Sequence, residues 1–359
     1  MTSPSDFRVC VTGATGFVAA WLVRELLERG ITVRGTVRRV ASADHLRALP
    51  GAAERLELVE ADLTVPASFE AAVRGCAVVF HTASPYVIQV DDPQRDLVDP
   101  AVNGTLGVLR ACTAAPDVAR VVLTSSMAAV TDEPDESRVL TESDWNEKST
   151  LQRNPYYFSK TLAERAAWTF MEQEKPRFDL VAMNPFMVMG PSLSPGVNVS
   201  NKIIADLVNG VYPGILSLTW GIVDVRDVAH AHVRAAEVQA AQGRYLLVQE
   251  PAVGMRTVVG WLREAGYGDG TKLPSRAMDN GFGNLLVKLN SYLQPAGVGS
   301  YLRTHIGRVP RYDTTKARQE LGITLRPTRE TVLDTARDLE RQGHIARRPG
   351  SGAGRSESR

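Results

Sequence analysis

One stretch decides the fold of this chain: Arg8-Val9-Cys10-Val11-Thr12-Gly13-Ala14-Thr15-Gly16-Phe17-Val18-Ala19. Its first five residues form a short apolar run that stops at Gly13, which is typical of a strand buried in a parallel sheet. From residue 17 to residue 29 the apolar side chains follow helical spacing, and Gly30 is a helix C-terminal signal. The stretch therefore predicts a strand, a glycine turn and a helix in immediate succession.

The same alternation continues along the chain. Further short apolar runs predict strands at 32–37, 56–60, 77–81, 120–124 and 178–183, and helical segments lie between them near 42–49, 66–74 and 101–115. Strands that alternate with helices at this pace indicate βαβ units. We expect an α/β fold with a Rossmann-type, doubly wound parallel sheet.

Beyond residue 190 the predicted elements become shorter, because Gly-Pro and Pro-Gly pairs interrupt the sequence. We expect a Rossmann domain at 7–190, to which 221–250 return. A smaller, mixed C-terminal lobe would comprise 191–220 and 251–342. The Gly-, Ser- and Arg-rich tail at 343–359 is predicted to be disordered.

Composition narrows the functional classes. The 359 residues carry a formal net charge of +1, which gives no electrostatic case for nucleic acid or a membrane surface. Cys10, Cys76 and Cys112 each lie in an apolar run, so we expect no disulfide and no metal. The first eight residues lack the apolar core of a signal peptide, and no apolar run reaches membrane-span length. A cytoplasmic monomer or homodimer is expected.

The glycine turn predicts a dinucleotide site. Two glycines let backbone N–H groups approach a pyrophosphate at the positive end of the following helix, although an ordinary strand–helix turn is the plainer alternative. The expected contacts are Gly13, Thr15, Gly16, Phe17 and Val18.

The end of the second strand selects the cofactor. NAD would require a carboxylate there for the ribose 2′-hydroxyl, whereas the sequence has Arg38 and Arg39. An arginine binds a 2′-phosphate through charge-assisted hydrogen bonds. We therefore predict NADPH, with Arg38 as primary contact and Arg39 or Ser42 assisting. The alternative is two solvated arginines in a loop.

Two further strand ends belong to the same edge of the sheet. Asp62, followed by Leu63, could accept from the adenine amino group or could simply be a turn residue. The fourth strand ends in His81-Thr82-Ala83-Ser84, at the carboxyl edge where cofactors lie in such sheets. His81 by itself is expected to be structural.

Chemistry is predicted on the segment that begins at Pro155, a typical first helical residue. Tyr156 and Lys160 are four apart and share one helix face. An ammonium beside a phenol favours the phenolate and lowers the tyrosine pKa, which suits a proton donor or acceptor, although this spacing also arises by chance. Ser126 follows the fifth strand. It could donate a hydrogen bond to a substrate carbonyl, or it could be only a strand-end cap.

The segments 12–19, 33–39, 78–85, 100–109, 120–126, 156–168, 184–191 and 224–232 together resemble the extended short-chain dehydrogenase/reductase superfamily. The chain is most similar to the group that holds dihydroflavonol 4-reductase, cinnamoyl-CoA reductase and NADPH-dependent methylglyoxal reductases. The resemblance covers 7–250 clearly and 310–342 loosely.

This resemblance implies a catalytic triad. Tyr156 would give a proton to the carbonyl oxygen as hydride arrives from the nicotinamide, Lys160 would bind the ribose, and Ser126 would orient the carbonyl. Pro185 and Val188 would pack on the nicotinamide, and Ser200 would contact the cofactor phosphates.

The implied activity is reduction of an aldehyde or ketone to a chiral alcohol. The expected substrate pocket is apolar and aromatic, although each candidate could equally be core: Ser84, Met127, Tyr157, Phe186 and Trp220. Arg226 could bind a substrate anion or pair with a neighbouring carboxylate. The alternatives are an epimerase, dehydratase or hydroxysteroid-type dehydrogenase, or a dinucleotide-sensing regulator. Pro100 argues against a sugar epimerase, since many extended members place a proton-relay asparagine there, and Asn103 is out of register.

Overall fold

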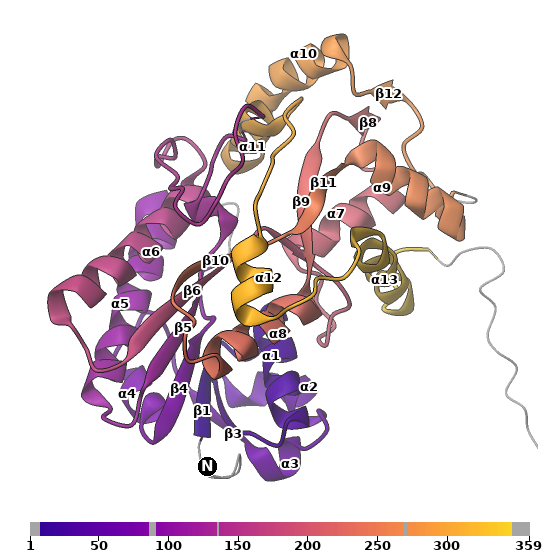
Figure 1. Cartoon of the computed structure of the whole chain (residues 1–359). Coiled ribbons are helices and arrows are strands. Elements are labelled where there is room, and N and C mark those ends of the chain that lie inside the picture. Colours follow the sequence, from indigo (N-terminus) through magenta and orange to yellow (C-terminus); the bar gives the residue numbers. More distant parts are fainter. Residues whose placement is uncertain (1–7, 86–90, 135, 269–270, 347–359) are drawn as a thin grey trace, which may run out of the picture.

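The structure is a computed structural model of the whole chain and describes residues 8–85, 91–134, 136–268 and 271–346. Its main sheet has seven parallel strands in the order β10-β6-β5-β4-β1-β2-β3 (Figure 1). The order reverses between β1 and β4, which is where ligands bind in open α/β sheets. The predicted Rossmann-type fold is confirmed. The strands are β1 (Arg8–Thr12), β2 (Thr32–Val37), β3 (Leu56–Glu60), β4 (Cys76–His81), β5 (Arg120–Thr124), β6 (Asp179–Pro185) and β10 (Gly243–Leu247).

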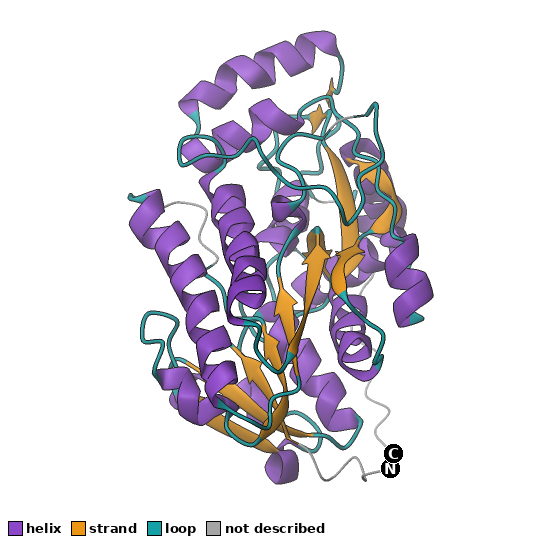
Figure 2. Cartoon of the chain, turned by 60° about the vertical axis from the view of Figure 1, so that its left-hand side comes forward, coloured by secondary structure: helices purple, strands orange, loops and turns teal. Residues whose placement is uncertain are grey.

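Helices cover both faces of this sheet (Figure 2). Val9 and Val11 point to the face covered by α1 (Phe17–Glu28) and α8 (Val225–Glu237). Cys10, between them, points to the face covered by α4 (Ser68–Val73), α5 (Asp99–Ala114) and α6 (Pro155–Glu174). This alternation follows from the two-residue period of a strand. The short helices α2 (Asp44–Arg47) and α3 (Ala52–Arg55) replace the single helix predicted near 42–49.

The three cysteines are free and buried in the second of these cores. Burial raises the thiol pKa of Cys10, Cys76 and Cys112, because a thiolate loses its hydration there. They are packing residues, as their apolar sequence neighbours indicated.

The second lobe is built on small sheets at the other end of the molecule (Figure 1). A mixed sheet pairs β9 (Thr219–Asp224) with β7 (Met187–Met189) and β11 (Gln249–Gly254), and a two-stranded sheet pairs β8 (Ile215–Leu216) with β12 (Ala277–Met278). Its helices are α7 (Val199–Val208), α9 (Met255–Leu262), α10 (Gly281–Asn290), α11 (Ala296–His305) and α13 (Thr328–Arg341).

The boundaries of the two parts differ from the expectation in three places. Strand β9 belongs to the small mixed sheet instead of returning to the main one. Helix α12 (Thr315–Leu321) packs its buried Ala317 and Leu321 into the main core beside α8, so this segment leaves the lobe. Ile345 is buried in the lobe core, which removes the start of the predicted tail, and residues 347–359 lie outside the described residues.

None of the helices in the described ranges is long and apolar enough to cross a membrane.

Candidate active site

The glycine turn after β1 is shaped for a close backbone approach. Gly13 has φ +64°, and a Cβ added there would lie 3.0 Å from Ala83. Helix α1 begins at the cap residue Gly16 with no side-chain cap and no acidic residue in its first turn. Its first N–H groups therefore face the sheet edge as donors, and a pyrophosphate fits this end of the helix.

Thr12 ties the two neighbouring strand ends together. Its Oγ1 accepts hydrogen bonds of 3.1 Å from the N–H groups of both Thr82 and Ala83. The hydroxyl therefore donates its own proton to Nδ1 of His81, 2.9 Å away. Burial and the nearby Lys160 charge lower the pKa of His81 to about 3. His81 is a neutral structural residue, as expected.

The ends of β2 and β3 lie beside this turn. Arg38 and Arg39 are exposed, and neither forms an ion pair within the described part of the chain. Asp62 Oδ1 accepts from the backbone N–H and hydroxyl of Thr64 at 2.8 and 2.7 Å, which is the turn role left open by the sequence. These bonds, with a smaller effect of Arg38, lower the pKa of Asp62. Leu63 packs against Gly104 of α5.

The predicted triad comes together at the carboxyl ends of β4 and β5. Pro155 is the first residue of α6, and the Lys160 Nζ atom lies 5.8 Å from the ring centroid of Tyr156. The same ammonium donates to Ser84 Oγ at 2.8 Å. Ser126 Oγ accepts from the Ala128 N–H at 3.1 Å, which leaves its own proton for another acceptor. Ser126 is therefore both a cap and a hydroxyl facing the cavity described below.

Lys160 is buried, and this weakens its proton affinity. Burial lowers the pKa of Lys160 to about 8, against the opposing effect of the Glu164 carboxylate. An ammonium held in a poorly hydrated site interacts strongly with nearby dipoles and hydroxyls, which suits a group that must orient a ligand.

Glu164, one turn further along α6, is a buried hub that sequence analysis missed. Its carboxylate accepts from Ser125 Oγ at 2.5 Å, Asn184 Nδ2 at 2.8 Å and Arg244 Nε at 2.7 Å. Asn184 Nδ2 also donates to the Ser126 carbonyl at 3.2 Å. The hub therefore fixes α6 against the ends of β5 and β6 and the start of β10. Only the helical spacing from Lys160 could have drawn attention to it.

A cavity of about 270 Å³ opens beside Tyr156 and Ser126. It lies between α6, the end of β6, the start of α7 and α11. No charged side chain lines it within the described ranges. Its walls are Ser126, Ala128, Asn154, Pro155, Tyr156, Tyr157, Phe186, Met187, Val199, Ser200, Ile203, Tyr212, Gly297, Val298 and Tyr301.

Of the expected pocket residues, Tyr157 and Phe186 line this cavity, and two others do not. Trp220 is 1% exposed and belongs to the lobe core, and Met127 is fully buried beneath the strand ends. Both side chains pack in the interior, so their placement gives no support to the expected contact with a substrate. Ser84 does not line the cavity either, because its hydroxyl turns to Lys160.

The remaining predicted contacts fall on either side of the cavity. Pro185 ends β6, and Val188 lies on β7 against the main core. Ser200 lies in the first turn of α7 and lines the cavity wall. It is not part of the glycine turn, so its placement gives no support to a contact with the cofactor phosphates. Arg226 is held by Asp224 at 2.7 Å and Asp334 at 2.8 Å, the structural alternative for that residue.

Comparison with known proteins identifies the family. The NAD dependent epimerase/dehydratase family matches residues 9–247. The chain belongs to this family. Cinnamoyl-CoA reductase CAD2 of Medicago truncatula is 47% identical over 257 residues, which are 68% of this chain and 76% of that protein. Cinnamoyl-CoA reductase 2 of the same plant is 38% identical over 349 residues, 96% of this chain and 94% of that protein.

Solved structures of proteins in complex with NADPH are similar to this chain over most of its length. Gre2 of Candida albicans in complex with NADPH superposes with a TM-score of 0.80 at 30% identity, covering 94% of this chain and 99% of that chain. Yeast methylglyoxal/isovaleraldehyde reductase Gre2 with NADPH gives a TM-score of 0.76 at 29% identity over 94% and 100% of the two chains. The resemblance drawn from the sequence segments is confirmed.

Proposed function

We propose that this epimerase/dehydratase family member is an NADPH-dependent carbonyl reductase. It reduces an uncharged aldehyde or ketone to an alcohol, with Tyr156 as proton donor. The relatives support the coarser part, an NADPH-dependent oxidoreductase of the cinnamoyl-CoA, dihydroflavonol and methylglyoxal reductase type that reduces carbonyl substrates. The finer part rests on one observation. Tyr156 and Ser126 line the same apolar cavity, and Lys160 lies one helical turn after the tyrosine on α6.

The residues present fit the cofactor. A side chain at Gly13 would crowd Ala83, so the turn stays without one, and the uncapped first turn of α1 offers N–H donors to the pyrophosphate. The unpaired guanidinium of Arg38 would hold the 2′-phosphate. When bound, the cofactor supplies the hydride.

The chain's own groups handle the oxygen of the carbonyl. Ser126 donates its free hydroxyl proton to that oxygen and orients it toward Tyr156. Tyr156 transfers its phenolic proton as negative charge grows on the oxygen. Lys160 holds its ammonium beside the phenol ring and stabilises the phenolate left behind.

The cavity lining favours an aryl or alkyl carbonyl compound. Arginine and lysine side chains are common partners of the phosphates of a nucleotide sugar or of CoA, and none lines this cavity within the described ranges. Phe186, Tyr212 and Tyr301 offer aromatic surface instead. An epimerase acting on a nucleotide sugar fits this lining less well.

The test is NADPH consumption by the wild-type protein, followed by the absorbance of the reduced nicotinamide. Free aryl and alkyl aldehydes and ketones are compared with cinnamoyl-CoA and with a nucleotide sugar. We expect turnover of the free carbonyl compounds. Turnover confined to cinnamoyl-CoA or to the nucleotide sugar would refute the assignment of an uncharged substrate.

A further inference from the structure

The residue before the catalytic helix has an unusual backbone. Asn154 caps α6 in the left-handed region, with φ +50° and ψ +62°, and it lines the cavity next to Tyr156. Only glycine and, less often, asparagine or aspartate adopt this region readily. A conformation of this kind persists when the surroundings hold it in place.

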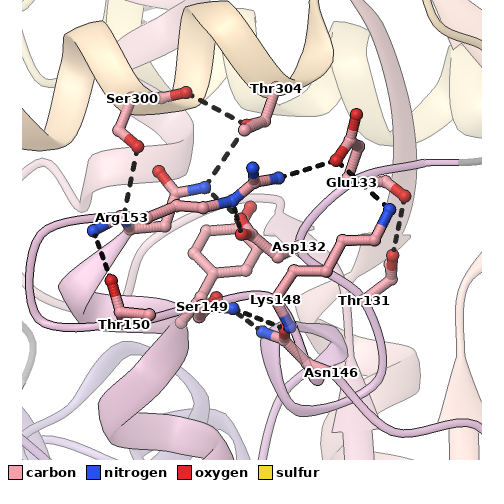
Figure 3. A network of polar contacts seen from close by, with 12 residues as sticks. Thr131, Asp132, Glu133, Asn146, Lys148, Ser149, Thr150, Arg153, Ser300 and Thr304 are labelled. Carbon is pink, nitrogen blue, oxygen red and sulfur yellow. Dashed lines mark hydrogen bonds and ion pairs between the residues drawn. The ribbon is translucent and has the colours of Figure 1, made fainter.

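Those surroundings come from two parts of the fold. The Asn154 side-chain amide donates to Asp132 Oδ1 and, at 3.3 Å, to Thr304 Oγ1. Its backbone N–H donates to Ser300 Oγ at 3.2 Å. Asp132 and Asn154 lie in the loop before α6, whereas Ser300 and Thr304 lie on α11 of the lobe. We call these four residues the α11 joint. Figure 3 labels three of them, Asp132, Ser300 and Thr304.

The joint is buried and its carboxylate is held. The Asp132 side chain is fully buried, and its second oxygen accepts from Arg153 Nε at 2.7 Å. Arg153 also donates to Glu133, so the loop side of the joint is braced by an ion-pair network (Figure 3). Buried polar contacts of this type fix one arrangement, because breaking them leaves unsatisfied groups.

The joint connects the catalytic helix to the far wall of the cavity. Helix α11 contributes Gly297, Val298 and Tyr301 to that wall. Helix α6 is anchored independently along its length by the Glu164 hub and by packing on α5. Helix α11 packs on α10 and on the turn before it, where Tyr292 and Leu293 are exposed, and it meets the lobe core through Tyr301 and Leu302. Loosening the joint would therefore displace α11 and leave Tyr156 in place.

We propose that the α11 joint is a positioning device that determines substrate specificity. Ser300 and Thr304 are positioning residues that hold the Val298–Tyr301 wall at a set distance from Tyr156. Carbonyl compounds large enough to touch this wall depend on the joint. Small aldehydes, which contact only Ser126 and Tyr156, do not depend on it.

The inference rests on the proposed function for its kinetic readout. The variant is Ser300→Ala/Thr304→Val, which removes both α11 acceptors of Asn154 and keeps the shape of Thr304. Its control is Thr335→Val, a buried helical threonine on α13 whose hydroxyl donates to the Thr331 carbonyl at 2.7 Å and whose side chain does not line the cavity. kcat and KM are measured for propanal and for 2-acetonaphthone.

We expect kcat/KM for the naphthyl ketone to fall on the order of tenfold while that for propanal stays within about twofold, since misplacing a wall affects only ligands that touch it. The single variant Thr304→Ser, which keeps the hydroxyl, should retain the wild-type ratio of the two kcat/KM values. An equal fall for both substrates, or no change for either, overturns the proposal.

A second measurement separates this proposal from the proposed function. Hydrogen exchange of the double variant should rise in residues 296–305 and stay at the wild-type level in the first turns of α6. If the wild type reduces no carbonyl compound, the proposed function fails, and the exchange pattern still decides whether the joint holds α11. Exchange unchanged in α11, or raised equally in α6, overturns the joint.

Discussion

Replacing Lys160 by methionine should stabilise the fold while it abolishes activity. Burial lowers the Lys160 pKa from 10.5 to about 8, so the ammonium is less stable in the folded protein than in the unfolded chain. At roughly 1.4 kcal/mol per pKa unit, the buried charge costs about 3 kcal/mol at pH 7. Methionine removes that cost and also loses the bond to Ser84, worth about 1 kcal/mol. The expected net gain is about 2 kcal/mol.

The pH dependence of this gain carries a definite sign. A folded pKa below the unfolded one means that the unfolded chain binds more protons between about pH 8 and 10.5, so wild-type stability rises with pH across that window. The advantage of Lys160→Met is therefore full below pH 8 and shrinks above it. Urea unfolding at pH 7, 8, 9 and 10 measures both the gain and its decline.

A surface lysine provides the matched control. Lys202 is 62% exposed and pairs with Asp206 at 2.6 Å, so Lys202→Met should change the free energy of unfolding by less than about 1 kcal/mol at every pH. The reasoning is refuted if Lys160→Met is less stable than the wild type at pH 7. It is equally refuted if the stability difference does not shrink as pH rises above 8.

Two further substitutions test the hub and the cofactor site. Glu164→Gln should lower the free energy of unfolding by about 3 kcal/mol, because it leaves the Arg244 charge buried without its counter-ion. As a control, Glu147→Gln breaks the exposed ion pair with Arg165 and should lower the free energy of unfolding by less than about 1 kcal/mol in the same urea titration. A Glu164→Gln variant as stable as the wild type would contradict the hub. Arg38→Ala should raise the KM for NADPH at least about tenfold and leave the KM for NADH nearly unchanged, because only the 2′-phosphate loses a partner. Equal rises in both KM values would remove Arg38 from the 2′-phosphate site.

Local patterns predicted the sheet and the centre of the site because each pattern there has one structural solution. The apolar run before Gly13, the glycine turn and the helical spacing after it admit little besides a strand–turn–helix unit. Tyr156 and Lys160 are neighbours on any helix that contains both. The parallel sheet then brings Ser126 to the same edge without further assumptions.

The substrate side could not be predicted, because residue type does not distinguish a cavity wall from a core. Trp220 in β9 and Phe186 directly after β6 are both aromatic, yet the first is buried in the lobe core and the second lines the cavity. Val298 and Tyr301 lie on α11, and no sequence motif marks that helix as part of a site. The contacts of Asn154 with α11 and of Glu164 with Arg244 join positions 146 and 80 residues apart, and no local pattern encodes them.

The central claim is that Tyr156 protonates the carbonyl oxygen. Tyr156→Phe keeps the ring and removes the proton, and Tyr157→Phe makes the same change on the adjacent residue, whose ring centroid lies 6.0 Å away. With NADPH and a carbonyl compound that the wild type reduces, kcat of Tyr156→Phe should fall at least about a hundredfold with the KM for NADPH unchanged. Tyr157→Phe should alter chiefly the KM for the carbonyl compound. Wild-type kcat in Tyr156→Phe would contradict the account.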